Sequence, residues 1–316
     1  MGFDNRNFQA AAASSASLGD MPEWNLDDLY ASMEAPELAA DIEWGRGEAK
    51  ALKAECAGRL AEVASDPQAL AVIIARYEAL QDRLGRVASY ASLLYAGNTA
   101  DPVRAKFYGD TQQKLTDITT DLLFFELELN LIDDGVLAAG FATPALAHYR
   151  PWIEDLRKEK PYQLEEKIEQ LFHEKGITGR GAWNRLFNET MTALKFSVDG
   201  EELSLEPTLN LLSDPREPRR RVAAEALAKV FKDNVRLFTL ITNTLAKDKE
   251  ISDRWRGFGD VAASRHLANR VEPEVVDALV ESVRTNYPRL SHRYYALKAR
   301  WMGMPPLSHW DRNAPL

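Results

Sequence analysis

Residues 171–180, LFHEKGITGR, place a histidine directly before a glutamate, which is how the metal-binding helix of many zinc peptidases begins. In such a helix a second histidine follows four residues after the first. Both imidazoles then face one metal ion, and the glutamate activates the bound water. Here the position four residues after His173 is Ile177, which has no lone pair to offer. The pair His173–Glu174 therefore does not predict a metal site.

The glycines around this pair predict how the helix that carries it ends. Gly176 and Gly179 disfavour a continuous helix through residues 171–180. We expect a helix that stops near Lys175, with Gly176 as its C-terminal cap. His173 and Glu174 would then be an ordinary polar pair at the end of a helix.

Other patterns that support catalysis are missing from the sequence. It contains no glycine-rich phosphate loop and no G-x-S-x-G nucleophile turn. No two histidines are spaced four residues apart, so a metal site could be assembled only from histidines distant in sequence. The five histidines are His148, His173, His266, His292 and His309.

Composition limits the class of protein. The chain has 316 residues, of which 45% are hydrophobic and 28% charged, and this is typical of a globular protein with a substantial core. The formal net charge of −9 argues against nucleic acid or an anionic membrane as the main partner, because phosphate binding needs a cationic surface. The single cysteine, Cys56, lies in a helical pattern, where we expect it to be buried and inert. A chain without a disulfide fits a reducing, cytoplasmic location.

The chain contains no apolar run of about 18 residues, so we expect no transmembrane helix. Its first residues lack the basic and apolar regions of a secretion signal. We interpret residues 1–20 as a flexible tail. The segment 23–34 follows, where Trp24, Leu26, Leu29 and Tyr30 would attach the chain to a core.

Helical periodicity dominates the sequence from Pro22 onward. A helix is expected over residues 36–65, with Pro36 in its first turn. Five further dipeptides place proline after an acidic or hydroxyl residue, which is typical of helix starts. They are Asp66-Pro67, Asp101-Pro102, Thr143-Pro144, Asp214-Pro215 and Glu272-Pro273. The sequence therefore predicts a mostly α fold, a multi-helix bundle.

The longest predicted helix covers residues 219–256, which contain neither glycine nor proline. Apolar residues recur there at helical spacing and predict a face that packs on a core. They are Leu227, Phe231, Val235, Phe238, Ile241 and Leu245. One segment departs from helical periodicity: residues 193–205 alternate apolar and polar side chains around Asp199-Gly200, which predicts a short β-hairpin.

Two segments carry side chains that could bind a ligand. Residues 176–196 place Arg180 between two glycines, ahead of Trp183 and Phe187. This pattern fits a hinge leading to an aromatic anchor, or a loop followed by a core helix. Residues 264–303 cluster arginines with aromatic residues, a combination that can hold a peptide carboxylate or stack on a ligand. The alternative is a solvated helix face with salt bridges to acidic residues.

Longer strings in this order resemble the oligoendopeptidase F family of zinc metallopeptidases, which are similar to thimet oligopeptidase. The resemblance covers residues 24–316. It is carried by LFHEKGITGRGAWNRLFNET, FSVDGEELSL, LLSDPREPRR, LITNTLAKDKEISDRW, SRHLANRVEPEVVDALVESV and YPRLSHRYYALKARWMG, with HWDRNAPL at the end.

The resemblance implies one part of a clamshell-shaped, mostly helical peptidase whose deep channel admits oligopeptides. It also implies one Zn²⁺ in the full-length enzyme, bound by a His-Glu-x-x-His helix and a later glutamate. This sequence contains no such motif, and it ends abruptly on Pro315-Leu316. We therefore expect a truncated chain that binds no zinc and is inactive alone. Residues 21–205 would form an N-terminal helical domain, and residues 206–316 the beginning of the catalytic domain.

The resemblance and the arginine–aromatic cluster together suggest which residues line the substrate channel. They are Arg265, His266, Arg270, Tyr294, Trp310 and Arg312. Oligopeptides are the expected substrates of the full-length enzyme. Truncation would leave apolar faces on the helices after residue 219 without a partner, so self-association is expected. The competing hypothesis is a non-catalytic helical module that binds peptides or proteins.

Overall fold

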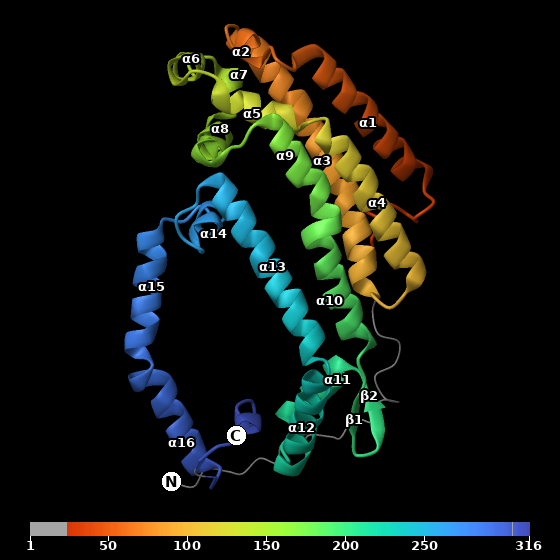
Figure 1. Ribbon diagram of the computed structural model, residues 1–316, viewed down its shortest axis with the longest axis vertical. Coiled ribbons are helices and arrows are strands. Elements are labelled where there is room, and N and C mark those ends of the chain that lie inside the picture. The colour runs from red at the N-terminus through yellow and green to blue at the C-terminus, as the bar shows by residue number, and fades with distance from the viewer. Residues whose placement is uncertain (1–23, 305) are drawn as a thin grey trace, which may run out of the picture.

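The computed structural model describes residues 24–304 and 306–316. Within these ranges the fold is mostly helical, with one two-stranded antiparallel sheet, as the sequence predicts (Figure 1). The predicted tail, residues 1–20, lies outside the described residues. No helix in the described part of the chain combines the length and the apolar character that a bilayer crossing requires.

The N-terminal helices form the upper layer in Figure 1, where α3 packs between α1 and α4. Asp66 and Asp101 each accept hydrogen bonds from two amides in the first turn of the helix that follows, so these two predicted helix starts are confirmed with their caps. The helices of this layer are α1 (Pro36–Cys56), α2 (Leu60–Val63), α3 (Pro67–Gly97), α4 (Pro102–Thr120), α5 (Leu123–Leu131), α6 (Asp134–Gly140), α7 (Pro144–Ala147) and α8 (Arg150–Arg157).

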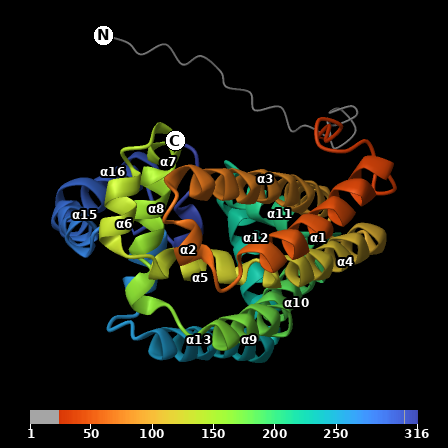
Figure 2. The ribbon, with the colours of Figure 1, turned by 90° about the horizontal axis from the view of Figure 1, so that it is seen from above.

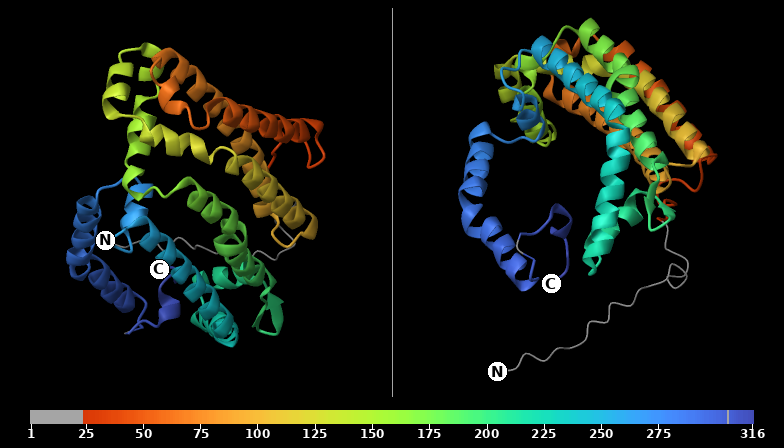
Figure 3. Two further views of the ribbon diagram at one scale, coloured as in Figure 1. Left: turned by 45° about the horizontal axis from the view of Figure 1, so that its top comes forward. Right: turned by 60° about the horizontal axis from the view of Figure 1, so that its bottom comes forward.

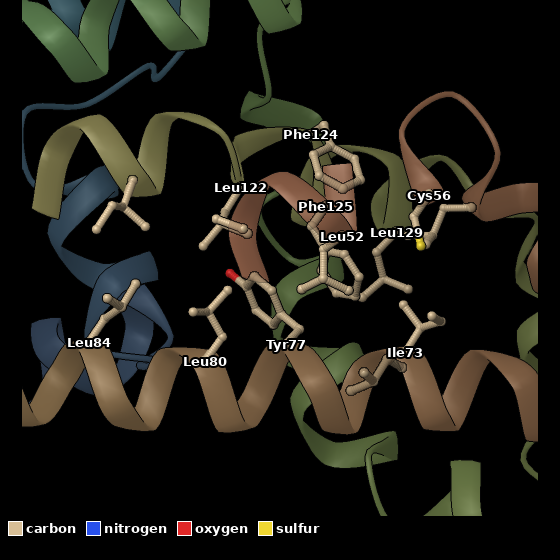
Figure 4. Close-up of a cluster of buried hydrophobic side chains, with 14 of the residues drawn as sticks. Leu52, Cys56, Ile73, Tyr77, Leu80, Leu84, Leu122, Phe124, Phe125 and Leu129 are labelled. Carbon is tan, nitrogen blue, oxygen red and sulfur yellow. The ribbon is translucent and has the colours of Figure 1, made fainter. Parts of the chain in front are cut away.

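This layer contains one large hydrophobic core, built from residues between Tyr30 and Leu156. Figure 4 shows side chains of α1, α3 and α5 meeting there, among them Leu80 and Phe125, which are fully buried. The rings of Tyr77 and Phe125 stack with their centroids 4.3 Å apart. Burial of each large apolar side chain stabilises the fold by about 1.5–3 kcal/mol. Cys56 is also fully buried, as predicted, and burial raises the pKa of its thiol.

The predicted helix over residues 36–65 is two helices, because Gly58 adopts a left-handed backbone, with φ of 76°, between α1 and α2. The Glu128 carboxylate of α5 accepts hydrogen bonds from the amides of Gly58 and Leu60, at 2.6 and 3.2 Å. Trp24 is also placed differently from the prediction, since its side chain is 71% exposed. Leu26, Leu29 and Tyr30 do attach the segment before α1 to the core.

After η1 (Lys160–Tyr162), helix α9 (Glu166–Gly176) continues through a wide π-helical turn, η2 (Ile177–Gly181), into α10 (Ala182–Ala193). The α-helical part ends at Gly176, close to the predicted stop near Lys175, but the predicted C-cap at Gly176 is wrong. Gly176 keeps a right-handed helical backbone, with φ of −55° and ψ of −35°, whereas a helix C-cap of this kind needs the left-handed region. The departure comes at Gly179, with φ of −92° and ψ of −116°. Where a loop was expected before α10, two helices therefore meet across a kink at Gly179.

The predicted hairpin is confirmed: β1 (Phe196–Val198) pairs antiparallel with β2 (Glu201–Leu203). Asp199 and Gly200 form its turn with φ of 54° and 87°, which is the turn geometry that Asp-Gly favours. The fully buried Phe196 packs the hairpin against the helix that contains Phe231, since the two ring centroids lie 5.7 Å apart.

The single long helix predicted over residues 219–256 is also two helices, α12 (Glu217–Asp233) and α13 (Val235–Arg256), after α11 (Leu205–Asn210) and η3 (Leu211–Ser213). They are separated at Asn234, whose side-chain amide donates to the carbonyl of Val230 at 2.9 Å. Asparagine competes in this way with the helical backbone. The break leaves Val235, a predicted core residue, 56% exposed, while Leu227 and Ile241 are buried.

Asp214-Pro215 does not start a helix directly. Helix α12 begins at Glu217 instead, with Pro218 in its first turn, because Asp214 accepts hydrogen bonds from the amide and the side chain of Arg216 in an extended turn. The predicted starts at Pro144 and Pro273 are confirmed.

The C-terminal elements are α14 (Ala263–Ala268), α15 (Pro273–Asn286), the π-helical turn η4 (Pro288–His292), α16 (Arg293–Trp301) and η5 (His309–Asp311). Helices α15 and α16 stand apart from the N-terminal layer in both views of Figure 3, whereas α14 lies beside that layer. No residue of α15 is buried in the described structure. Helix α13 packs on η2 and α10, and its last residue, Arg256, pairs with Glu169 of α9, so α13 joins the N-terminal layer to the C-terminal part (Figure 2).

Candidate functional site

The candidate site is a cavity of about 790 Å³ between the N-terminal layer and helices α13 and α14. The N-terminal layer lines it from α3, α4 and α5, and η1 and α9 continue the same wall (Figure 1). Its polar lining residues include Tyr77, Gln81, Glu126, Glu169, Arg180, Asp248, Lys249, Ser252, Arg256 and Arg265. The cavity therefore offers hydrogen-bond donors and acceptors, and side chains of positive and of negative charge.

Three side chains form a hydrogen-bonded group on the α3–α5 wall. The Tyr77 hydroxyl donates to Glu126 Oε1 at 2.9 Å, and the Gln81 amide donates to the Tyr77 oxygen at 2.6 Å. Burial raises the pKa of the Glu126 carboxyl; the hydrogen bond from Tyr77 opposes this shift, and the charge of Glu159 adds to it. Burial likewise raises the pKa of the Tyr77 phenol. Glu126 is thus a carboxyl group that holds a proton more readily than an exposed one.

An ion pair links the two walls. Arg256, the last residue of α13, donates from Nη1 and Nη2 to the two carboxylate oxygens of Glu169 in α9, both at 2.7 Å. Burial alone raises the pKa of Glu169, but the Arg256 guanidinium and the Leu164 amide together hold it below its usual range. A bidentate pair of this kind fixes direction as well as distance, so it sets how α13 lies against α9.

Lys249 fixes the other side of the cavity. Its ammonium group pairs with Asp253 on α13 and donates to the carbonyl of Val261 and the hydroxyl of Ser264, at 2.9 and 3.0 Å. These bonds hold α14 and the loop before it against α13. Consequently Arg265, on α14, faces the cavity.

A second cavity of about 500 Å³ extends the first along η2. The two share six lining residues, Leu123, Glu169, Arg180, Asp248, Ser252 and Arg256. Phe172 and His173 of α9 line the added part. The two cavities together form an elongated, partly polar groove along the junction of α9 and α13.

The residues predicted to line a channel do not all meet here. Of the six, Arg265 lines the cavity of about 790 Å³, and its neighbour His266 lies on the same short helix. Arg270 is paired with Asp155 at 3.1 Å, at the end of α14. Tyr294 is 46% exposed on α16. Arg312 lines a separate open cavity of about 950 Å³ near η5, and Trp310 donates to Glu217 at 3.1 Å.

The adjacent residues His173 and Glu174 have different surroundings in the structure. His173 Nε2 lies 2.9 Å from the hydroxyl of Thr119 on α4, while Glu174 is exposed on another side of α9. Among residues 24–304 and 306–316, no three His, Cys, Asp or Glu side chains lie close enough together to hold a metal ion. The described residues therefore do not fit the zinc ion that the resemblance implies for the full-length enzyme.

Sequence reasoning missed Glu126, Glu169 and Arg256. Glu126 carries a local signal, because it is a charged residue inside the apolar run LLFFELELNL. A charge within such a run is rarely buried without a partner. Glu169 and Arg256 carry none, because 87 residues separate them and only the packing of α13 on α10 and η2 brings them together.

Comparison with known proteins confirms the resemblance. A family model described as Oligopeptidase F matches residues 128–196. The chain is 25% identical over 314 residues to oligopeptidase PepF of Bacillus subtilis. The alignment covers 93% of this chain and 44% of that protein. It is also 25% identical over 249 residues to group B oligopeptidase PepB of Streptococcus agalactiae, covering 75% of this chain and 40% of that protein. The chain thus spans less than half the length of these curated relatives.

The fold is similar to a solved structure as well. The crystal structure of oligoendopeptidase-F from Enterococcus faecium superposes with a TM-score of 0.78 at 21% identity. The match covers 88% of this chain and 56% of that one. The mostly α architecture with its single hairpin is therefore a fold found in that protein.

Proposed function

We propose that this chain is the N-terminal part of a zinc-dependent oligoendopeptidase that cleaves short peptides in the cytoplasm. The observation that carries the proposal is the similarity to oligopeptidase PepF across 93% of the chain. In this proposal residues 21–205 form an N-terminal helical domain, and residues 206–316 begin the catalytic domain. The groove along α9 and α13 would be one wall of the channel that receives the peptide.

The chemistry of the groove supports a peptide as its ligand. An extended peptide presents backbone donors and acceptors, apolar side chains and a charged group at each end. The groove offers the acceptors of Glu126 and Asp248, the guanidinium groups of Arg180 and Arg265, and apolar surface between them. Arg180 and Arg265 form no ion pair with any described residue, so both can meet a peptide carboxylate.

Hydrolysis would need residues other than those described. The zinc ion of such an enzyme acts as a Lewis acid and activates water. Residues 24–304 and 306–316 bring together no ligand set for it. We therefore propose that the chain contributes peptide binding and orientation, and that it does not cleave peptides alone.

A non-catalytic helical module that binds peptides or proteins is the second candidate. The observation that favours it is that the groove is formed within this chain, without any added polypeptide. Reading the gene beyond codon 316 separates the two proposals. An in-frame His-Glu-x-x-His motif supports the peptidase, whereas a stop codon supports the module.

A binding and cleavage assay tests the proposed function on the chain itself. The purified chain is mixed with a short fluorescent peptide, with added zinc and then with a chelator. We expect binding without cleavage, and weaker binding by Arg265→Ala than by the matched variant Arg284→Ala, since Arg284 does not line the groove. Cleavage that the chelator abolishes would show that a metal site has been missed. Equal peptide binding by the two variants would contradict the proposal that the groove binds the peptide.

A further inference from the structure

One part of the cavity of about 790 Å³ is lined by residues whose side-chain oxygens have no hydrogen-bond donor. Asn130 is 3% exposed, and its side-chain oxygen has no partner within the described chain. The buried side-chain oxygen of Gln163 also lacks a donor there. Both residues line the cavity. Buried polar atoms are normally hydrogen-bonded, because their lost solvation must be compensated. The two oxygens therefore point to a ligand that supplies donors.

The hydrogen bonds of the two amide groups assign their nitrogen and oxygen atoms. Asn130 Nδ2 donates to the carbonyl of Leu156 at 3.3 Å, and Gln163 Nε2 donates to the carbonyl of Leu127 at 3.1 Å. Each nitrogen is thus bonded within the wall of the cavity, which leaves each oxygen as the acceptor without a donor. The bond to Leu127 also holds Gln163 against α5, the helix that precedes Asn130 by one turn at that point.

Glu126 adds a carboxyl group to these two amides. It lies four residues before Asn130 on α5, so the two side chains share one face of the helix. One of its oxygens accepts from the Tyr77 hydroxyl, and the other has no hydrogen bond to any residue that the structure describes. Burial raises the pKa of the Glu126 carboxyl, the bond from Tyr77 opposes the shift, and the charge of Glu159 adds to it. We call Glu126, Asn130 and Gln163 the acceptor group.

The positive charges of the cavity lie on other elements. Among the described lining residues, those between 121 and 163 include Glu126 and Glu159 but no lysine or arginine. Arg256 and Lys249, both on α13, are paired with Glu169 and Asp253. The remaining guanidinium groups of the cavity belong to η2 and α14. The wall that carries the acceptor group is therefore negative and has no cation of its own.

We propose that the acceptor group binds a positively charged nitrogen group of the peptide, which is a basic side chain or the amino terminus. The inference rests on the proposed function, because it states which peptides the groove prefers. A guanidinium group has five N–H donors and an ammonium group has three, so either can supply the donors that these oxygens lack. Glu126 supplies the opposite charge, and hydrogen bonds between charged partners are the stronger kind. The arginines of η2 and α14 then remain for a carboxylate, so the two walls together orient the peptide.

Calorimetric titration of the purified chain with unlabelled peptides tests this preference. The reference peptide has one lysine and a free amino terminus. A second peptide replaces the lysine by norleucine, and a third has an acetylated amino terminus. We expect one of these two changes, which identifies the group bound, to weaken binding about tenfold or more. Glu126→Gln should weaken binding of the reference peptide to a similar degree. If Glu126→Gln binds the reference peptide as tightly as the unmodified chain does, the proposal is wrong.

Two controls separate charge recognition from a disturbed fold. Glu165→Gln makes the same change on an exposed side chain that lines neither cavity, and it should bind every peptide as the unmodified chain does. Glu126→Gln should also leave the affinity for the weaker, uncharged peptide unchanged. A loss of affinity for all three peptides alike would indicate a structural role for Glu126 and would contradict the proposal.

A small cation distinguishes failure of this inference from failure of the proposed function. Agmatine has a guanidinium and an ammonium group but is not a peptide, and butylurea is an uncharged analogue. The chain should bind agmatine more tightly than butylurea, and Glu126→Gln should remove the difference. Binding of agmatine but of no peptide would contradict the proposed function and leave the acceptor group supported. Peptide binding that needs Arg265, with agmatine binding that Glu126→Gln does not change, would contradict the acceptor group alone.

Discussion

Arg220 Nη2 lies 2.6 Å from Asp311 Oδ1, and both side chains are 1% exposed although 91 residues separate them. Arg220 also donates to the carbonyls of Asp214 and Pro215, at 2.8 and 2.9 Å. Asp311 accepts in addition from the amide of Ser308. This buried pair holds the C-terminal segment against α12, at the opposite end of the molecule from the large hydrophobic core.

The first prediction is that Arg220→Met destabilises the chain strongly. The substitution leaves the Asp311 carboxylate buried without its cation, and the loss of one partner of a buried pair costs about 3–5 kcal/mol. Urea denaturation followed by circular dichroism measures the free energy of unfolding. The double variant Arg220→Met with Asp311→Leu should recover most of the loss, because it removes both charges.

A surface pair provides the control for this prediction. Arg216 and Asp214 form an ion pair in which the Arg216 side chain is 65% exposed. Arg216→Met should change the free energy of unfolding far less than Arg220→Met does, because solvent screens an exposed ion pair. If Arg220→Met behaves like Arg216→Met, the C-terminal segment does not dock on α12 in solution.

The second prediction concerns Glu126 and pH. Because burial raises the pKa of this carboxyl, the folded state binds its proton more tightly than the unfolded state does. The resulting stabilisation is fully present below the pKa of the unfolded state and is lost as the pH rises through the raised folded pKa. Glu126→Gln should therefore stabilise the chain more at about pH 8 than at about pH 4. Denaturation at both pH values measures the difference, and an effect of equal size at both would contradict the prediction.

The third prediction has the opposite sign and concerns the ion pair across the same cavity. The pKa of Glu169 is depressed, so its stabilisation is present above the unfolded pKa and is lost as the pH falls through the folded pKa. Glu169→Gln should accordingly destabilise the chain at neutral pH and have a smaller effect in acid. Arg256→Lys should cost about 1.5–3 kcal/mol, because a single ammonium cannot reproduce the two parallel hydrogen bonds. If Arg256→Lys left the free energy of unfolding unchanged, the bidentate pair would not form in solution.

The features that the sequence predicted correctly are those that neighbouring residues determine. Asp199-Gly200 fixes its hairpin through its own backbone preferences, and Asp66-Pro67 fixes a helix start through its own side chain. The break at Asn234 was missed because asparagine is only mildly unfavourable in a helix. Whether the chain forms one continuous helix or two helices there therefore depends on tertiary packing. The residues of the groove were mostly missed because pairs such as Glu169 and Arg256 are joined by packing over long sequence separations.

The candidate channel residues illustrate the same limit. Arg265 and Arg312 were grouped because arginines and aromatic residues cluster in the C-terminal sequence. In the structure they line different cavities, because α15 and α16 carry the chain away from the groove to η5, which contacts α12 (Figure 1). The clustering of arginines in the sequence thus indicated side chains that could bind a carboxylate. The assignment of Arg265 and Arg312 to one channel stays a prediction.

The last prediction concerns the π-helical turn between α9 and α10, where two glycines have opposite roles. A Cβ atom at Gly181 would lie 2.9 Å from the backbone oxygen of Gly176, so Gly181→Ala must move the backbone of the turn. We expect a loss of about 1–3 kcal/mol, the range found for overpacking. A Cβ at Gly176 meets nothing within 4 Å, and its backbone is helical. Gly176→Ala should therefore stabilise by about 0.5–1 kcal/mol.

The two variants serve as controls for each other, since both replace glycine by alanine within six residues of one helix. Urea denaturation gives the two free energies of unfolding, and binding of a short peptide reports on the groove that Arg180 lines beside this turn. Gly181→Ala should weaken peptide binding, because the bend directs Arg180 toward α13, and Gly176→Ala should leave it unchanged. Stabilisation by both substitutions would mean that α9 and α10 form one regular helix in solution, without the turn.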